Sequence, residues 1–191
     1  MTGFSAFMAY IFLTAFTPGP NNIMAMSNAG NFGLRRALIF SLGVFFGMLI
    51  VMSACAAAGS LLYAAVPAIE PWLRLAGTAY ILFLAWMIFR STGGPDGDAR
   101  TSGFLNGVIM QLINVKVIIY GLTALSVFVL PHYTSLPSLA GFVLILSAMG
   151  LAGTAAWACG GSLLHKLFLT RRRLVNTVLA LSLVICAASS F

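Results

Sequence analysis

The amino-acid sequence predicts an all-α integral membrane protein, and three observations carry that prediction. Hydrophobic residues make up 61% of the 191-residue chain, and only 7% of its residues are charged. Soluble domains have about 25% charged residues. The mean hydropathy is +1.04, and the apolar residues form six long stretches. Soluble enzymes, disordered chains and disulfide-rich domains are therefore excluded.

Each apolar stretch is predicted to be one membrane-crossing helix, since about 20 apolar residues suffice for a crossing. Turn signals separate the stretches. The dipeptides Val66-Pro67 and Glu70-Pro71 are expected to break the chain before the third helix, and the segment 91–102 is rich in Gly and Asp. The six predicted helices are Phe4–Asn28, Ala37–Val66, Trp72–Phe89, Phe104–Leu130, Ser138–Leu164 and Leu174–Ala188.

The loop charges predict the orientation of the chain. Eight of the ten Lys and Arg residues lie after the first, third and fifth helices, whereas the opposite side has only Arg74. The positive-inside rule then places these three loops in the cytoplasm and both termini outside. The net charge of +7 is explained by cations that orient the chain in the membrane. The predicted partner is therefore the lipid bilayer and not nucleic acid. The chain reads as one transmembrane domain, residues 1–191, with a cytoplasmic loop at 91–103.

An internal repeat is predicted for the two halves, residues 1–94 and 101–191, although few residues are identical between them. A shift of 97 positions lays the first three helices on the last three, and it places Thr17-Pro18-Gly19 on Asn114-Val115-Lys116. Three helices per half is an odd number, so the halves would have opposite orientations in the membrane. Inverted repeats of this kind are typical of transporters, whose substrate site lies at the repeat interface near the midplane.

A proline-rich motif interrupts the first predicted helix. Its two prolines remove backbone donors and clash with the preceding turn, so the carbonyls near positions 14 to 16 lose their helical partners. Such a break can hold the charged ends of a small substrate, and the alternative is a structural kink relieved by neighbouring helices. We favour the substrate site, which comprises Thr17, Pro18, Gly19, Pro20, Asn21 and Asn22.

A polar stripe is also predicted on the first helix. Tyr10, Thr14, Thr17 and Asn21 follow helical spacing and would share one face of a continuous helix. The stripe serves either the substrate or a contact between helices through hydroxyl groups. The sequence does not separate these two roles.

Lys116 is the second candidate for function. It lies near the centre of the fourth predicted helix, where a Lys costs about 2.5–3.5 kcal/mol on insertion scales. No Asp or Glu lies in any predicted span, so its partners would be carbonyls, amides, water or a substrate carboxylate. A lysine held by broken-helix carbonyls for structure alone is the less favoured alternative.

Three polar residues flank Lys116 on the same helix. On a continuous helix Tyr120 shares the face of Lys116, whereas Gln111 and Asn114 point toward the other side. Asn114 and Lys116 can meet one ligand only if the helix is distorted between them. Otherwise, Gln111 and Asn114 would bind a neighbouring helix.

Three glycines on the second helix indicate close helix packing. Gly43 and Gly47 have small-xxx-small spacing, and Gly59 follows. They would serve either a contact within the chain or a homodimer. The cysteines are isolated within apolar segments and the two histidines lie apart, so no disulfide framework, metal site or cofactor is predicted.

These motifs resemble those of the LysE/RhtB family of bacterial amino-acid exporters over nearly the full chain. The resemblance rests on Pro18-Gly19-Pro20-Asn21, on Gly43, Gly47 and Gly59, and on the run from Gln111 to Lys116. Val115 stands where the family commonly has Pro, and Met48 stands where many relatives have an acidic residue. The Asn-Val-Lys sequence, followed by the run from Val117 to Gly121, is similar to the branch that exports cysteine and O-acetylserine.

The resemblance implies proton-driven efflux of amino acids or their derivatives across the bacterial inner membrane, and the loop charges predict that both termini lie in the periplasm. Lys116 would then meet the substrate carboxylate, and carbonyls and amides near Thr17 and Asn21 would hold its ammonium group. The proton would be carried by Lys116, or the protein would be an exchanger or a facilitator. A membrane scaffold would leave Lys116 and the proline motif unused, and an enzyme would need a nucleophile with a base, a carboxylate pair or a metal set.

Overall fold

The structure is a computed structural model that describes residues 2–91 and 102–188, with the side chains of residues 2, 58–70, 73 and 74 outside the description. The predicted all-α class is confirmed for this part of the chain. The elements are α1 (Thr2–Phe16), α2 (Pro20–Phe32), α3 (Leu34–Arg90), α4 (Phe104–Ile113), α5 (Val115–Thr123), the π-helical turn η2 (Ala124–Val129), α6 (Leu136–Leu163), α7 (His165–Thr170) and α8 (Arg172–Ala188).

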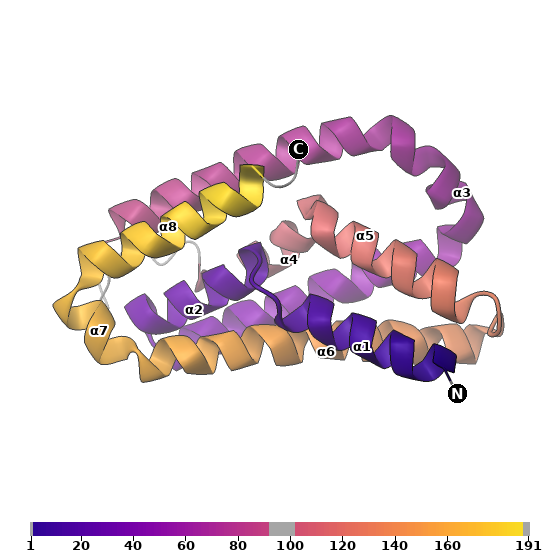
Figure 1. The fold of residues 1–191 in the computed structure, drawn as a ribbon, viewed down its shortest axis with the longest axis horizontal. Coiled ribbons are helices and arrows are strands. Elements are labelled where there is room, and N and C mark those ends of the chain that lie inside the picture. Colours follow the sequence, from indigo (N-terminus) through magenta and orange to yellow (C-terminus); the bar gives the residue numbers. More distant parts are fainter. Residues whose placement is uncertain (1, 92–101, 189–191) are drawn as a thin grey trace.

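The helices lie side by side along the long axis of the molecule (Figure 1). α1 and α2 follow one another from the N-terminal end, α6 runs alongside both, and α8 lies beside the second half of α3. α7 joins α6 to α8 at the end opposite the N-terminus. Gly33, which links α2 to α3, has a φ of +89°, a left-handed conformation that glycine adopts without a steric penalty.

α3 corrects one expectation from the sequence. The second and third predicted helices are joined without a non-helical link, because the helical backbone of α3 continues for 57 residues through Pro67 and Pro71. Prolines can kink a helix as well as end it, and Figure 1 shows α3 turning back on itself between two arms. The predicted break between the second and third helices is therefore wrong, because both prolines lie within one continuous helix.

Two helices in the described residues are long and apolar enough to cross a membrane, Leu34–Ala57 and Leu136–Leu163. The pair α4 and α5–η2 passes the same test as one span that is bent by 66°. Gly3–Phe16 and Leu75–Arg90 are shorter apolar helices. The structure therefore supports a membrane protein with two or three such spans, and six crossings stay a prediction.

Two interrupted helices dominate the middle of the bundle. The first predicted helix is divided at residues 17–19 into α1 and α2, as expected from its prolines. The fourth predicted helix is divided at Asn114, which lies between α4 and α5 with an extended backbone (φ −85°, ψ 99°). Phe16 and Ile113, the last residues of α1 and α4, are 97 positions apart. The two interruptions therefore lie at positions that the predicted shift of 97 residues superposes.

Glycines bring neighbouring helices into backbone contact. A Cβ on Gly43 would meet the carbonyl oxygen of Phe104, and one on Gly47 would lie 2.8 Å from that of Val108. The two predicted packing glycines therefore serve a contact between α3 and α4 within the chain, and the surroundings of Gly59 lie outside the described side chains. On α6, a Cβ on Gly153 would meet the Ala15 carbonyl of α1.

The same helix makes a second contact of this kind further along. A Cβ on Gly161 would meet the carbonyl oxygen of Met26 in α2. α6 therefore lies directly against the backbone of both halves of the first interrupted helix.

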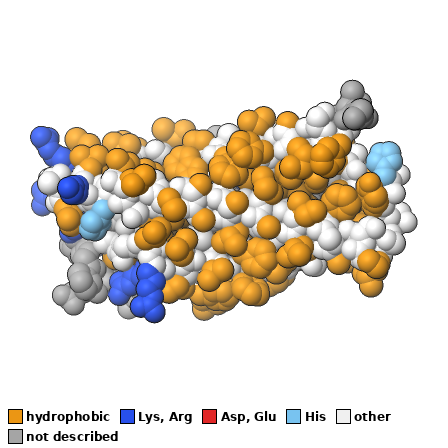
Figure 2. All heavy atoms as spheres, turned by 90° about the horizontal axis from the view of Figure 1, so that it is seen from below, with side chains coloured by type: hydrophobic (Ala, Val, Ile, Leu, Met, Phe, Trp, Pro, Cys, Tyr) orange, Lys and Arg blue, Asp and Glu red, His pale blue; other side chains and the backbone are white. Residues whose placement is uncertain are grey.

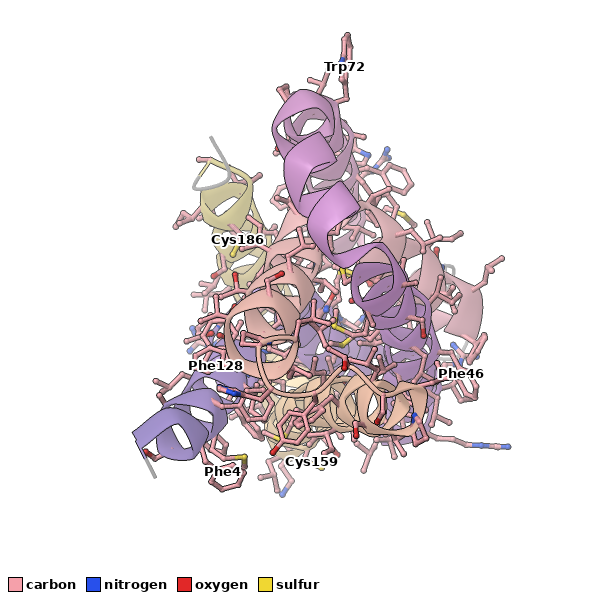
Figure 3. The ribbon with its side chains drawn as sticks, turned by 90° about the vertical axis from the view of Figure 1, so that its right-hand side faces the viewer. Phe4, Phe46, Trp72, Phe128, Cys159 and Cys186 are labelled. Atoms are coloured by element: carbon pink, nitrogen blue, oxygen red, sulfur yellow. The ribbon has the colours of Figure 1, made fainter. Side chains whose placement is uncertain are left out.

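The outer surface of the bundle is apolar. Large hydrophobic side chains are exposed around its circumference, and Phe4, Phe46 and Trp72 point outward (Figure 3). The Lys and Arg side chains visible in Figure 2 gather at one end of the molecule, and the visible middle carries mostly hydrophobic side chains. A contiguous apolar belt of this extent would aggregate in water, so the surface indicates lipid as its solvent.

Candidate functional site

Three amides join the two interrupted helices at their breaks. The Asn21 Nδ2 group donates to Gln111 Oε1 at 2.8 Å, and Gln111 Nε2 donates to Asn21 Oδ1 at 3.2 Å. Asn114 Nδ2 also donates to Asn21 Oδ1 at 3.2 Å. Gln111 is fully buried, and Asn114 is 6% exposed. Asn21, at the start of α2, is therefore bonded to the end of α4 and to the break that follows it.

The end of α1 exposes carbonyls that other residues satisfy. Asn22 Nδ2 donates to the carbonyls of Ala15 at 2.9 Å and of Thr17 at 2.8 Å. The indole Nε1 of Trp157 on α6 donates to the carbonyl of Phe16 at 3.0 Å. The predicted loss of helical partners is therefore answered by side chains, as a buried backbone acceptor requires.

The second break forms without a proline. Asn114 is the N-cap of α5, and its Oδ1 accepts a hydrogen bond from the Lys116 backbone N–H at 3.1 Å. Asn is among the best N-cap residues for this reason. The Asn114 carbonyl accepts from the backbone N–H groups of Val117 and Ile118, which starts the new helix. The helix is therefore distorted between Asn114 and Lys116, and both residues reach the same site.

Lys116 lies against the first break. Its Nζ donates to Thr17 Oγ1 at 3.4 Å, and a Cβ on Gly19 would lie 3.0 Å from the same nitrogen. Gly19 has an extended backbone that any residue adopts, so the glycine is needed there for space. Glu70, Asp96 and Asp98, which are the acidic residues of the sequence, lie outside the described side chains, and Lys116 forms no salt bridge within the described part.

Two cavities adjoin at Lys116. The smaller has a volume of about 40 Å³ and lies between the two breaks and α6. The larger has a volume of about 360 Å³ and extends toward α3 and α8. Both are lined by Thr14, Gly19, Pro20, Asn114, Lys116 and Tyr120. The ammonium group therefore belongs to the wall that the two cavities share.

Two tyrosines form the apolar side of this region. The rings of Tyr10 and Tyr120 are stacked with centroids 5.9 Å apart. The Tyr120 hydroxyl donates to the Leu146 carbonyl of α6 at 3.5 Å. Tyr120 is 4% exposed, so its ring is held rigidly beside Lys116.

The structure brings nearly all of the predicted site residues to one place. Tyr10, Thr14, Pro18, Gly19, Pro20, Asn21, Asn22, Asn114, Lys116 and Tyr120 line one or both cavities, Thr17 contacts Lys116, and Gln111 is bonded to Asn21. The predicted continuous stripe is wrong at its end, because Asn21 belongs to a different helix from Tyr10 and Thr14. The stripe residues reach the cavities from two helices.

Sequence reasoning missed several residues that complete the site. Met48, Gly150 and Thr154 line the smaller cavity, and Thr78 and Cys186 line the larger one. Cys186 comes from α8 and Cys159 lies on the exposed face of α6 (Figure 3). These residues lie in apolar stretches, and their positions at the cavities come from the packing of the helices. The half-buried Trp157 supports the site through its indole N–H, which donates to the Phe16 carbonyl.

Comparison with known proteins adds to this geometry. The family model for LysE type translocators matches residues 12–189. The cysteine/O-acetylserine efflux proteins of Escherichia coli (strain K12) and Shigella flexneri serotype 5b (strain 8401) are each 43% identical to this chain over 188 residues. Each match covers 98% of this chain and 96% of the relative. No solved structure gives a significant match. The chain therefore belongs to the LysE type translocator family, and it is a transport protein rather than an enzyme.

Proposed function

We propose that this protein is a secondary transporter that exports small amino acids or their derivatives across the bacterial inner membrane. The substrate class is that named for its relatives, cysteine and O-acetylserine. The adjoining cavities at the two breaks are the proposed site. Their walls combine one cation, several amides and an aromatic face, which suits a small zwitterion with a short side chain.

The observation that carries this proposal is the meeting of Lys116 with two helix N-termini. α2 begins at Pro20 and α5 begins at Val115, and both residues line the larger cavity with Lys116. Helix N-termini carry partial positive charge and unpaired N–H groups, and they favour anions. Transporters use half-helix N-termini to hold a substrate carboxylate. The carboxylate is therefore assigned to the side of Lys116, beside the starts of α2 and α5.

The ammonium group of the substrate is assigned to the tyrosine side of the cavity. The carbonyls of Ala15, Phe16 and Thr17 already accept hydrogen bonds from protein side chains, so they are poorer ligands than the sequence led us to expect. Tyr120 and Thr14 line both cavities. An aromatic face attracts a cation, more strongly where water is excluded.

The paired breaks support a proposed mechanism of alternating access. The two interruptions are 97 residues apart, and movement of one half against the other would open one cavity at a time toward each side of the membrane. A neutral zwitterion gains nothing from the membrane potential, which acts at about 2.3 kcal/mol per charge per 100 mV. Export against a gradient therefore requires a coupled proton or an exchanged solute.

The orientation follows from the end of the bundle where the cations gather (Figure 2). The positive-inside rule favours the cytoplasm for this end, and the proposed orientation therefore has the N-terminus in the periplasm.

Counterflow in proteoliposomes tests the proposal. Vesicles loaded with unlabelled O-acetylserine or cysteine should take up the labelled compound when they contain the wild type, and a pH gradient should change the rate if protons are coupled. Lys116→Met should abolish uptake while the protein stays monodisperse in detergent. Lys166→Met removes the same kind of side chain from exposed α7, and it should leave uptake unchanged.

Two results would contradict this function. One is the absence of counterflow by folded wild type across a panel of amino acids. The other is a normal rate in Lys116→Met, which would show that the lysine only supports the structure.

A further inference from the structure

A second basic site lies far from the transport cavities, between the end of α3 and the start of α8. A cavity of about 710 Å³ is lined there by Arg90, Ser91, Arg172, Arg173 and Thr177, together with Phe89 and Asn176. The first residues of α8 add the partial positive charge of a helix N-terminus to these three guanidinium groups. The cavity therefore has the electrostatics of an anion site.

Buried donors at this place have no acceptor in the described part of the chain. The Oγ of Ser91 and the Nε of Arg172 are buried and make no hydrogen bond with any described residue. Buried polar groups in folded proteins are nearly always hydrogen-bonded. Asn176 is 1% exposed and donates to the Ser91 carbonyl at 3.1 Å, so the backbone beside the Ser91 hydroxyl is fixed. Two donors held in place indicate a ligand with several acceptor oxygens.

An apolar groove continues from the basic cavity along the same pair of helices. It has a volume of about 290 Å³, and its lining includes Leu82, Trp86, Leu181 and Val184. Phe89 and Thr177 line both the groove and the basic cavity, so the two spaces adjoin. The Arg90 guanidinium lies over the Trp86 ring, 5.2 Å from its centroid, which holds this arginine at the junction.

We propose that this composite site binds one anionic phospholipid, with the phosphate among Arg90, Arg172 and Ser91 and an acyl chain in the groove between α3 and α8. Guanidinium groups recognise phosphate through several hydrogen bonds at once. Basic sites between transmembrane helices bind lipid headgroups on the cytoplasmic side, where the positive-inside rule places this end of the molecule. A soluble phosphate compound would use the basic cavity but would leave the adjoining groove unexplained.

Quenching of Trp86 by brominated lipids tests this site. The variant Trp72→Phe/Trp157→Phe keeps Trp86 as its only tryptophan and is placed in nanodiscs of phosphatidylcholine. Brominated phosphatidylglycerol should quench Trp86 at a lower mole fraction than brominated phosphatidylcholine, by about fivefold for each basic contact made. Arg172→Gln in the same background should reduce the preference for brominated phosphatidylglycerol about fivefold.

A matched control separates the site from general surface charge. Arg35→Gln removes an exposed arginine at the start of α3, outside the lining of the basic cavity, and should leave the lipid preference unchanged. Equal quenching by the two lipids, or an equal loss of preference in both Arg variants, would overturn the proposal. Loss of preference on adding inorganic phosphate, against potassium chloride at matched ionic strength, would also overturn it in favour of a soluble anion.

A second measurement uses the wild type and the two Arg variants with all three tryptophans in place. In detergent, phosphatidylglycerol should raise the melting temperature of the wild type and of Arg35→Gln more than phosphatidylcholine does, because a ligand of the native state stabilises it. Arg172→Gln should reduce that difference. A shift that Arg172→Gln retains in full would contradict the assignment.

Discussion

The two interrupted helices reach similar shapes by different means. Between α1 and α2, the chain has the three consecutive residues Pro18, Gly19 and Pro20. Residues 17–19 are non-helical, and α2 begins at Pro20. Between α4 and α5, a single non-helical residue, Asn114, separates two helices that have no proline at the break. The first break is encoded locally, whereas the second depends on contacts with Asn21 and on the cap that Asn114 supplies.

This difference teaches which parts of a transport site can tolerate motion. A proline break persists whatever its neighbours do. A break that is held by side-chain hydrogen bonds can close or open when those bonds change. We therefore expect the α4–α5 bend to be the more variable of the two during transport, and substitutions at each break should have different effects.

The largest effect is expected when the first break is healed. The triple substitution Pro18→Ala/Gly19→Ala/Pro20→Ala restores donors and helix-forming residues throughout the motif, and it adds a Cβ that displaces the Lys116 amine. Counterflow should fall below detection in protein that remains monodisperse on size-exclusion chromatography. Normal transport by this variant would show that both breaks depend on tertiary contacts. It would contradict the claim that the first break is encoded by its own residues.

Asn21→Ala should have the next largest effect, because it removes the bonds that reach the second break. Gln111 is fully buried, and a buried group left without a partner destabilises a protein by about 1–3 kcal/mol. We expect a lower melting temperature and a counterflow rate reduced about tenfold.

Two further variants interpret that result. Asn106→Ala changes an Asn of α4 that lines neither cavity, and this control should retain the wild-type rate. Additive effects of Asn21→Ala and Asn114→Ala in a double-mutant cycle would contradict the coupling between the breaks.

Trp157→Phe should have a smaller effect, confined to stability. It removes the hydrogen bond to the Phe16 carbonyl and retains most of the ring volume. Hydrogen bonds between membrane helices contribute about 0.6 kcal/mol on average. Thermal unfolding followed by circular dichroism should show a small decrease in the melting temperature, and counterflow should stay within about threefold of wild type. A complete loss of transport would assign Trp157 to the substrate.

Val115→Pro should have the smallest effect and sharpens the comparison most. Val115 is the first residue of α5, a position that proline favours. The extended backbone of Asn114 suits a residue before proline. The bend should be retained, so the melting temperature should be unchanged, and counterflow should stay within about twofold of wild type despite the loss of the Val115 N–H. Val117→Pro is the contrasting variant, because it removes the hydrogen bond from the Val117 N–H to the Asn114 carbonyl. Equal counterflow rates in the two variants would contradict the claim that hydrogen bonds at Asn114 hold this bend.

The sequence predicted the parts of this molecule that local chemistry determines. Prolines indicated the first break, and a lysine without a carboxylate partner indicated the cavity. The second break was not predictable from Val115 alone, because Asn21 supplies its partners from 93 positions away. Continuity of α3 through Pro67 was also missed, because proline signals a disturbed helix without deciding between a bend and an end. Likewise, Met48 and Cys186 enter the site only through packing.

α6 also constrains the length of the first interrupted helix, because it contacts that helix at two positions. It contacts Ala15 through Gly153 and Met26 through Gly161, so eight residues of one continuous helix run beside eleven residues of a broken one. At 1.5 Å per residue the two stretches would be about 12 Å and about 16 Å long if both were regular helices. The chain leaves the helix between these two contacts, at residues 17–19. An uninterrupted helix would place its carbonyls out of register with these two glycines, so the contacts with α6 favour the interrupted form.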